Sequence, residues 1–384
     1  MTKEKPTEPR LRFPGFTDAW KQRKLGEVVD VCSGRDYKHL EAGSIPVYGT
    51  GGYMLSVSEA LSENVDAIGI GRKGTIDSPY ILKAPFWTVD TLFYCLPKKN
   101  FALEFAYAVF QNVNWKSMDE STGVPSLSKV RINNVKVLTP KLQEQEAIGS
   151  FFSDLDQLIT LHQRKLDSVK GLKKALLQKM FPKGNGNDFP ELRFPEFTDA
   201  WKQRKLGEVL DERNESRSPS ADVPLVSFTV ENGVTPKTER YNREFLVRDD
   251  DKKYKFTQLD DIVYNPANLK FGAIARNKYG AAVFSPIYIT YTVIPDASPV
   301  FIELVVTFAD FIQRALRYQE GTVYERMAVK SSDLLRSEIL LPTLSEQEAI
   351  GSFFSDLDQL ITLHQRQLDH LKLLKKALLQ QMFI

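Results

Sequence analysis

Two stretches of the chain repeat apolar residues at spacings of three and four, the periodicity of a helix that packs along a seam. The seam positions are Ile148, Phe152, Leu155, Ile159, His162 and Leu166 in the first stretch and Ile350, Phe354, Leu357, Ile361, His364 and Leu368 in the second. Each stretch follows a proline, Pro140 or Pro342, where a helix can begin. Because two matching seams in one chain can pack on each other, the pattern predicts a long antiparallel two-helix coiled coil. Two separate helices, each packed on its own domain, are less favoured because the seam outlasts one domain face.

The residues around these helices form an internal repeat. Residues 9–30 recur almost unchanged at 190–211, and residues 144–164 recur unchanged at 346–366. Because repeated sequence predicts repeated structure, we expect two halves with the same plan. In each half a constant opening segment comes first, a divergent insert follows, and a constant long helix ends the half.

The inserts, roughly 31–137 and 212–339, share almost no sequence but match in outline. Each carries β-branched and aromatic runs typical of strands, such as 65–70 and 288–294. Each then continues with a helix, which in the second insert is expected over 300–316 behind a Ser-Pro cap. The predicted fold class is therefore α+β, with two pseudo-symmetric globular domains joined by the coiled-coil spacer.

This organisation divides the chain into four predicted parts. Residues 1–140 hold the first opener and the first globular domain, and residues 141–183 form the central spacer helix. Residues 184–342 hold a linker, the repeated opener and the second globular domain, and residues 343–384 form the C-terminal spacer helix. A segment rich in Gly, Asn and Pro at 182–190 marks the halfway boundary.

Both long helices are introduced by the same motif, Pro-x-Leu-x-Glu-Gln, at 140–145 and 342–347. Together with the repeated openers and the two dissimilar inserts, this motif resembles the specificity subunits of type I restriction–modification enzymes. The resemblance implies that the inserts are target recognition domains, each reading one half of a split DNA sequence. It also implies that the two helices set the gap between the half-sites. Because the two inserts differ, the target would be bipartite and asymmetric.

The resemblance also implies the partners: double-stranded DNA, two methyltransferase subunits, and restriction subunits. The chain would be non-catalytic by itself, within a complex with adenine DNA methyltransferase and ATP-dependent type I endonuclease activity. S-adenosylmethionine, ATP and Mg²⁺ would belong to the partner subunits, so we expect no cofactor in this chain. We expect a cytoplasmic protein without a membrane segment, because the sequence shows neither a signal-peptide pattern nor a sufficiently long apolar run.

Composition and charge refine this picture. The 384 residues are 42% hydrophobic and 26% charged, which suits two soluble domains with real cores. Lys and Arg number 51 against 49 for Asp and Glu, a net charge of +2, so we expect the partners to supply much of the phosphate affinity. Two cysteines and four scattered histidines argue against a disulfide framework or a metal centre.

Candidate DNA-contacting side chains occupy predicted turns and loops of both inserts. In the first insert, Arg72 and Lys73 lie in a glycine-flanked turn from which they can reach a phosphate or a guanine edge. In the second, Asn265 and Asn268 occupy a similar place, and asparagine suits a bidentate contact with adenine. The full candidate set is Arg35, Lys38, Arg72, Lys73, Ser126 and Lys129 in the first insert and Asn265, Asn268, Lys270, Arg276, Lys278, Tyr324, Arg326 and Lys330 in the second. For any one of them, a solvated turn fits the pattern as well as a DNA contact does.

The sequence leaves two alternatives from other functional classes. The main one is a scaffold that clamps two protein partners with its two heads and shows no sequence-dependent DNA retention. The other is an oxidoreductase, because Gly69–Gly74 matches a dinucleotide-binding pattern, but Pro79 follows early and no helical pattern opens there. The sequence contains no phosphate-binding loop, amino-methyltransferase motif or nucleophile elbow.

Overall fold

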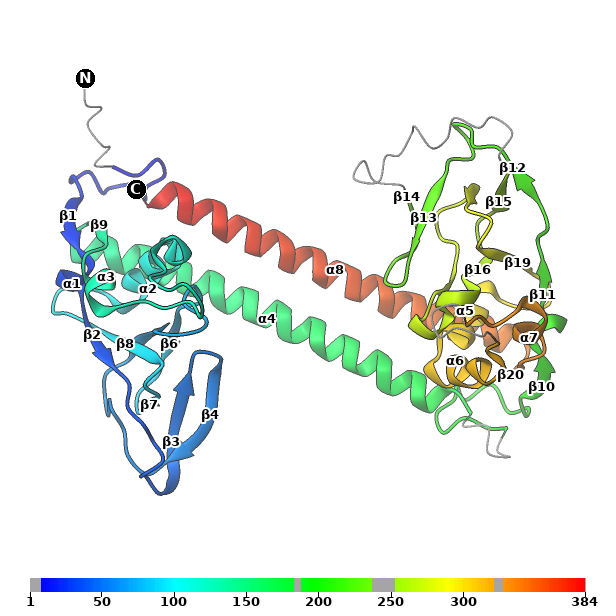
Figure 1. The fold of residues 1–384 in the computed structure, drawn as a ribbon, viewed down its shortest axis with the longest axis horizontal. Coiled ribbons are helices and arrows are strands. Elements are labelled where there is room, and N and C mark those ends of the chain that lie inside the picture. Colours follow the sequence, from blue (N-terminus) through cyan, green and yellow to red (C-terminus); the bar gives the residue numbers. More distant parts are fainter. Residues whose placement is uncertain (1–7, 183–187, 237–252, 321–326, 384) are drawn as a thin grey trace. The chain divides into compact units, whose positions relative to one another are not determined.

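The computed structural model describes residues 8–182, 188–236, 253–320 and 327–383. The chain divides into two compact units (Figure 1). Unit 1 contains residues 1–166 and 364–384, and unit 2 contains residues 167–363. Each unit therefore combines one opener, one insert, and parts of both long helices. The division into the four consecutive segments 1–140, 141–183, 184–342 and 343–384 stays a prediction.

Unit 1 is an α+β domain built on a four-stranded antiparallel sheet in the order β2-β8-β5-β6. A three-stranded sheet, β4-β3-β7, and a two-stranded ladder, β1-β9, complete it. Its strands are β1 (Lys21–Lys24), β2 (Val29–Ser33), β3 (Ala42–Gly49), β4 (Gly52–Val57), β5 (Ala67–Gly71), β6 (Tyr80–Leu82), β7 (Trp87–Thr88), β8 (Leu92–Pro97) and β9 (Lys136–Thr139). Its short helices are α1 (Leu25–Val28), α2 (Leu103–Asn112), η1 (Trp115–Met118) and α3 (Lys129–Asn133).

Unit 2 follows the same plan with different sequence. Its four-stranded sheet has the order β11-β19-β16-β17, and the ladder β10-β20 repeats the ladder β1-β9 of unit 1. Its strands are β10 (Lys202–Lys205), β11 (Leu210–Glu212), β12 (Ser216–Arg217), β13 (Val226–Thr229), β14 (Gly233–Pro236), β15 (Tyr254–Thr257), β16 (Ile262–Tyr264), β17 (Ile274–Arg276), β18 (Ala282–Phe284), β19 (Ile289–Val293) and β20 (Glu338–Leu341). Its short helices are η2 (Leu206–Glu208), η5 (Pro266–Phe271), α5 (Pro299–Thr307), α6 (Ala309–Ala315), η6 (Leu316–Tyr318) and α7 (Ser331–Leu335). The predicted pair of pseudo-symmetric α+β domains is confirmed.

The helix expected over 300–316 is interrupted at Phe308. This residue has an extended backbone, with φ −69° and ψ 134°, and it separates α5 from α6. The hydroxyl of Thr307 donates to the carbonyl of Glu303, a local bond that competes with the helical pattern. The interruption brings the Phe308 ring to 6.1 Å from that of Phe181, so it adds an aromatic contact to the core.

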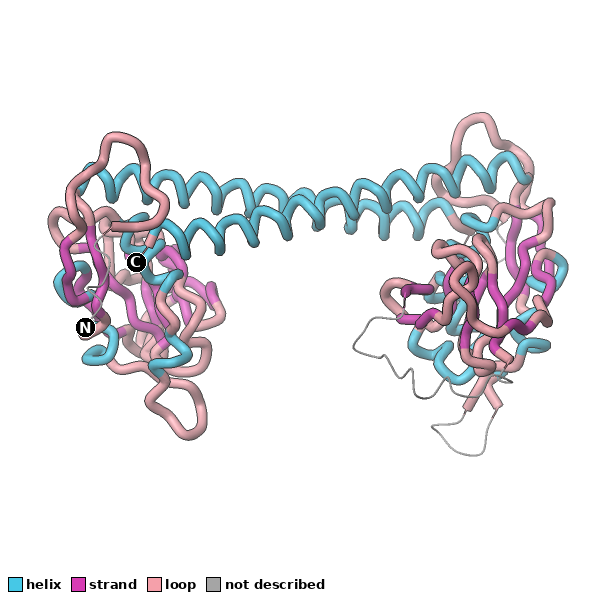
Figure 2. The backbone as a smooth tube through the Cα atoms, turned by 90° about the horizontal axis from the view of Figure 1, so that it is seen from above, coloured by secondary structure: helices cyan, strands magenta, loops and turns pink. Residues whose placement is uncertain are grey.

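The two long helices are α4 (Leu142–Met180) and α8 (Leu344–Met382), each of 39 residues (Figures 1 and 2). In unit 1, Lys375 of α8 pairs with Asp156 of α4, and in unit 2, Lys173 of α4 pairs with Asp358 of α8. Within each unit, residue numbers fall along one helix as they rise along the other. The predicted antiparallel two-helix coiled coil is therefore confirmed.

The seam positions of both helices lie on the side that packs. Half of them are buried and half are partly buried. The buried ones are Ile148, Phe152, Leu166, Ile350, Phe354 and Leu368, and the partly buried ones are Leu155, Ile159, His162, Leu357, Ile361 and His364. The rings of His162 and His364 face each other across the seam with centroids 6.0 Å apart.

The end of the opposite helix completes the core of each unit. In unit 1, the Phe383 ring, just past α8, lies 6.1 Å from that of Trp20 and 5.6 Å from that of Phe105. In unit 2, the Phe181 ring, just past α4, lies 5.7 Å from that of Trp201. Phe383 is far away in the sequence from the rest of the core of unit 1, whereas Phe181 lies just before the opener of unit 2. Among the described residues, no helix is long and apolar enough to cross a membrane.

Candidate functional site

A buried glutamate at the start of α4 anchors the opener of unit 1. Glu144 is 2% exposed and accepts hydrogen bonds from Arg12 Nε at 2.7 Å and Arg12 Nη2 at 2.8 Å. Trp20 Nε1 also donates to it, at 3.2 Å. The hydrogen bond with Glu144 raises the pKa of Arg12 above its ordinary value. A buried carboxylate needs partners of this kind, so the contact fixes the opener on the helix.

Unit 2 repeats this arrangement. Glu346 is fully buried and accepts from Arg193 Nε and Nη2, both at 2.7 Å, and from Trp201 Nε1 at 3.3 Å. The glutamate of the Pro-x-Leu-x-Glu-Gln motif therefore has the same structural role in both halves. This role accounts for the Arg and Trp that both openers share.

The glutamine of the same motif holds the insert. Gln145 donates to the carbonyl of Pro140 at 3.0 Å, and its Oε1 accepts from the backbone N of Ala102 at 3.1 Å, just before α2. Gln347 repeats both contacts in unit 2, where Ser298 N takes the place of Ala102 N at 3.0 Å. Because the bond goes to a backbone amide, it does not depend on the side chains of the insert. Constant helices thus carry two unlike inserts.

In unit 1, four of the predicted residues line one cavity of about 400 Å³. Arg72 and Lys73 come from the turn after β5, Ser126 comes from the segment before α3, and Lys129 is the first residue of α3. A β-bridge between Lys73 and Ser126 and a 3.0 Å bond from Leu127 N to the Arg72 carbonyl hold the two segments together. The structure therefore brings together side chains that the sequence separates.

Glycines allow the tight turn that presents Arg72. A Cβ on Gly71 would lie 1.9 Å from the Thr75 carbonyl oxygen, so no larger residue fits there. Gly74 has φ +91°, a conformation that favours glycine. The Gly69–Gly74 pattern thus forms the end of β5 and a turn, and no helix opens from it as a dinucleotide-binding loop would require.

A second cavity, of about 700 Å³, lies beside the first. Lys38 lines it together with the tip of the β3–β4 hairpin and residues 89–91. The same 89–91 turn supports Arg72, whose backbone N donates to the Thr91 carbonyl at 2.8 Å. The loop that carries Arg35 lies close by, since Trp87 Nε1 donates to the Arg35 carbonyl at 3.0 Å. All six candidates of the first insert therefore belong to neighbouring segments.

The basic candidates in and around these two cavities have few acidic partners. Within the described part of the chain, Arg35, Lys38, Lys73 and Lys129 form no ion pair. The neighbouring carboxylate of Asp119 instead accepts bonds from its own loop, which lower its pKa. Unpaired cations on a solvent-facing surface are the feature expected of a phosphate-binding surface.

The basic candidates of the second insert, by contrast, are largely compensated. Arg276 and Lys278 both bind Glu303, at 3.0 and 2.9 Å, and Arg276 also binds Asp260. Lys330 pairs with the carboxylate of Glu320. The ammonium of Lys270 lies 5.0 Å from the Phe271 ring centroid, and Asn268 is exposed. Tyr324 and Arg326 lie outside the described residues.

Asn265 is used within the protein. It is buried, and its Oδ1 accepts from Ala267 N at 3.1 Å, so it caps the short helix η5. A bidentate contact with adenine needs both atoms of the amide, which this cap engages in part. A DNA contact by Asn265 stays a prediction and requires the cap to open.

Sequence reasoning missed the tip of the β3–β4 hairpin. Tyr53 is 63% exposed and Met54 is 49% exposed, and both line the second cavity. The available signal was the Gly51–Gly52 pair between two strand-like runs, which is typical of a hairpin. Among the described residues, no group of three or more His, Cys, Asp or Glu side chains is placed to hold a metal ion.

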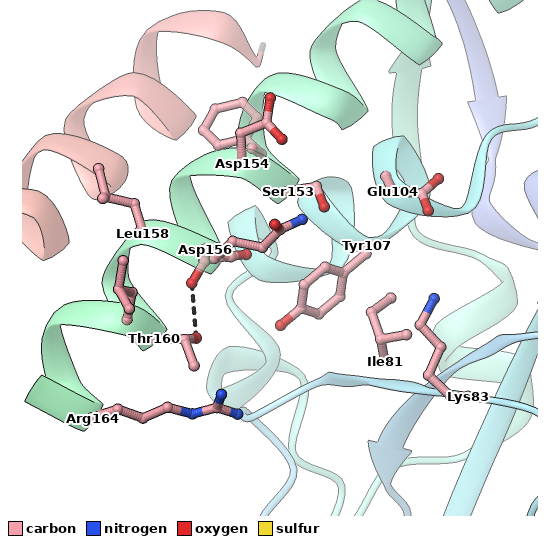
Figure 3. Close-up of a pocket in the computed structure, with 13 residues that line it drawn as sticks. Ile81, Lys83, Glu104, Tyr107, Ser153, Asp154, Asp156, Leu158, Thr160 and Arg164 are labelled. Atoms are coloured by element: carbon pink, nitrogen blue, oxygen red, sulfur yellow. Dashed lines mark hydrogen bonds between the residues drawn. The ribbon is translucent and has the colours of Figure 1, made fainter.

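A groove also lies between each insert and the long helix of its unit. In unit 1 it has a volume of about 790 Å³, with Asp156 and Thr160 of α4 facing Tyr107 of α2 (Figure 3). In unit 2 a cavity of about 820 Å³ includes Asp358 and Thr362, the copies of the same helix residues. The helix walls of the two grooves therefore share several equivalent residues, while the insert walls differ.

Comparisons with known proteins agree with the resemblance seen in the sequence. A family model described as the type I restriction modification DNA specificity domain matches residues 17–171. The chain is 25% identical over 340 residues to the type I restriction enzyme MjaVIII specificity subunit of Methanocaldococcus jannaschii, covering 82% of this chain and 75% of the relative. It is 21% identical over 414 aligned residues to the MjaIX specificity subunit of the same organism, covering 94% and 92%.

A solved structure shares the fold. The S subunit of the type I restriction-modification system from M. genitalium superposes with a TM-score of 0.68 at 13% identity, covering 98% of this chain and 99% of that one. At this identity the likeness concerns the architecture of the chain.

Proposed function

We propose that the chain is a specificity subunit of a type I restriction–modification enzyme and that it reads DNA sequence on behalf of such a complex. It works within the complex and is not itself the catalyst. The observation that carries the proposal is the combination of a duplicated frame of nearly identical sequence with two unlike surfaces. On one of those surfaces, Lys38, Arg72, Lys73 and Lys129 line two neighbouring cavities, and none of the four forms an ion pair with a carboxylate of the described residues.

The frame explains how two different half-sites can be read by one chain. The contacts of Glu144 and Gln145, repeated by Glu346 and Gln347, hold each insert in the same way whatever its surface. Unlike inserts then recognise unlike sequences, so the target is bipartite and asymmetric. The long helices α4 and α8 set the distance between the two half-sites, since each is about 58 Å long at 1.5 Å per residue.

The repeated helix surface suits two copies of one partner. Residues 144–164 and 346–366 are identical, so each unit offers the same exposed helix side chains beside its insert. We assign these surfaces to two methyltransferase subunits, with restriction subunits joining the assembly. S-adenosylmethionine, ATP and Mg²⁺ then belong to those partners, and the complex works in the cytoplasm. With a net charge of +2, the chain relies on its partners for part of the phosphate contact.

Methylome sequencing tests the proposal directly. Cells that carry this chain with its methyltransferase subunits should show adenine methylation at one bipartite motif with two unlike halves. Replacement of residues 31–137 by the insert of another specificity subunit should change one half of that motif and leave the other half intact. A chain whose removal leaves the methylation motif unchanged would be the two-headed scaffold instead, and a swap that alters both halves would contradict the two-domain reading mechanism.

A further inference from the structure

We propose that Arg72 reads a guanine in the half-site recognised by unit 1, while Lys73 and Lys129 contact the DNA backbone beside it. This inference rests on the proposed DNA-reading function and narrows it to one side chain and one type of base. It follows from how rigidly Arg72 is presented, how little its guanidinium is engaged, and which groups surround it.

The backbone of Arg72 is fixed on both sides. Its N donates to the Thr91 carbonyl at 2.8 Å, and its carbonyl accepts from Leu127 N at 3.0 Å. Gly71 and Gly74 shape the turn in which Arg72 lies. A side chain at position 71 would clash with the backbone, and position 74 has a backbone conformation that favours glycine. A side chain on such a fixed turn loses little conformational freedom when it binds, which favours specific recognition.

The guanidinium of Arg72 is oriented but largely free. Its centre lies 5.9 Å from the centroid of the Phe93 ring, and Nη1 makes a long bond of 3.4 Å to the Asp90 carbonyl. Arginine carries five N–H donors in a planar fork, and no carboxylate of the described residues pairs with this one. Guanine presents two acceptors, O6 and N7, in the geometry that this fork matches.

The other charged side chains in the cavity of Arg72 favour a base edge over a phosphate as the partner of Arg72. Glu120 also lines the cavity and is held through Oε2 by Ser128 N at 3.1 Å. A carboxylate repels phosphate but can accept a hydrogen bond from the amino group of cytosine, so the cavity suits a G·C pair. Lys73 and Lys129 are compact charges on flexible stems, which suit phosphate oxygens better than the paired acceptors of guanine.

The other candidate arginines among the described residues, Arg276 and Arg35, fit this role less well. Arg276 in unit 2 is held by Glu303 and Asp260, so its fork is occupied. Arg35 in unit 1 is exposed but lines neither of the two cavities. Arg72 therefore combines three features. Hydrogen bonds fix its backbone, no carboxylate of the described residues pairs with its guanidinium, and it lines the same cavity as Lys73 and Lys129.

The test uses the full chain in complex with its methyltransferase subunits. Methylomes are compared for the wild type and for R72A, R72K, K73A and K129A, and the half that changes on replacement of residues 31–137 is taken as the unit 1 half-site. We expect that half to contain a G·C pair, and we expect R72A and R72K to lose discrimination at that pair by about 5- to 150-fold. K73A and K129A should weaken methylation without relaxing any base, and each should reduce the salt slope of binding by about 1.

A modified base gives a second readout. Oligonucleotides with 7-deazaguanine at the assigned position lack the N7 acceptor, so the wild-type complex should bind them at least about fivefold more weakly. The R72A complex should bind modified and unmodified DNA equally. R72K keeps the charge of Arg72 and loses only its fork, so it decides the question even if R72A proves unstable.

Several outcomes would overturn the assignment. A unit 1 half-site without a G·C pair would do so, as would R72A or R72K variants with undiminished discrimination. Wild-type insensitivity to 7-deazaguanine, or equal relaxation of both halves, would do so as well. If the wild-type complex shows no bipartite motif, the proposed function fails and the Arg72 assignment falls with it. A clear wild-type motif that Arg72 variants leave intact overturns the guanine assignment alone.

Discussion

Replacement of Glu144 by alanine should destabilise unit 1 strongly, because it removes the carboxylate partner of the largely buried Arg12. Glu144 is 2% exposed and accepts three hydrogen bonds, two from Arg12 and one from Trp20. The side chain of Arg12 is itself only 12% exposed, so the guanidinium would stay in a poorly solvated place. Breaking a buried ion pair by removal of one partner costs about 3–5 kcal/mol. An orphaned Trp20 N–H adds about 1–3 kcal/mol to this.

The assay is denaturant unfolding of the purified chain followed by tryptophan fluorescence. The matched control is E146A, two residues further along the same helix, where the side chain is exposed and a change within about 0.5 kcal/mol is expected. E346A should lower the stability of unit 2 by a similar amount, since Glu346 makes the equivalent contacts. An E144A chain as stable as E146A would refute the idea that this buried pair holds the opener.

The remaining predictions concern the long helices. Ile159→Asp and Ile361→Asp each place a charge in the partly buried seam and should cost several kcal/mol, impairing folding or assembly and leaving sequence preference unchanged. Gln157→Asp, at an exposed position of the same helix, is the control for thermal unfolding. Four residues inserted after Leu161 add about 6 Å of helix and should lengthen the DNA spacer by about two base pairs. A matched insertion after Leu363 should recover lost stability, and methylation that persists at the original spacing in an active complex would exclude the helices as the ruler.

The sequence predicted best those features that rest on long periodic patterns. The spacer helices expected at 141–183 and 343–384 correspond to Leu142–Met180 and Leu344–Met382, because a seam of three and four persists over many turns. The bounds of the short helices and strands were predicted less closely, since tertiary contacts decide where these elements begin and end. The break at Phe308, for example, depends on packing against Phe181, a residue that lies far away in the sequence.

Candidate site residues were harder to assess for the same reason. Arg276 and Lys278 look like free basic residues in the sequence, and only the packing of α5 reveals that Glu303 neutralises them. Asn265 carried a local signal that could have been used, because an asparagine followed by proline is typical of a helix cap. By contrast, no local pattern shows that Arg72 and Lys129 share a cavity.

A glycine in each copy of the long helix explains how one frame accepts two unlike inserts. A Cβ on Gly149 would lie 2.8 Å from both Glu104 Cβ and Phe105 N, so α2 packs directly on the helix backbone. We therefore expect G149A to be destabilising, because overpacking costs about 1–3 kcal/mol and the better helix propensity of alanine returns only about 1 kcal/mol. Gly171 in the same helix has no neighbouring atom within 4 Å of an added Cβ, so G171A should be neutral or stabilising by up to about 1 kcal/mol. Denaturant unfolding of the two variants checks the difference, and equal stability of G149A and G171A would contradict close docking of the insert on the helix.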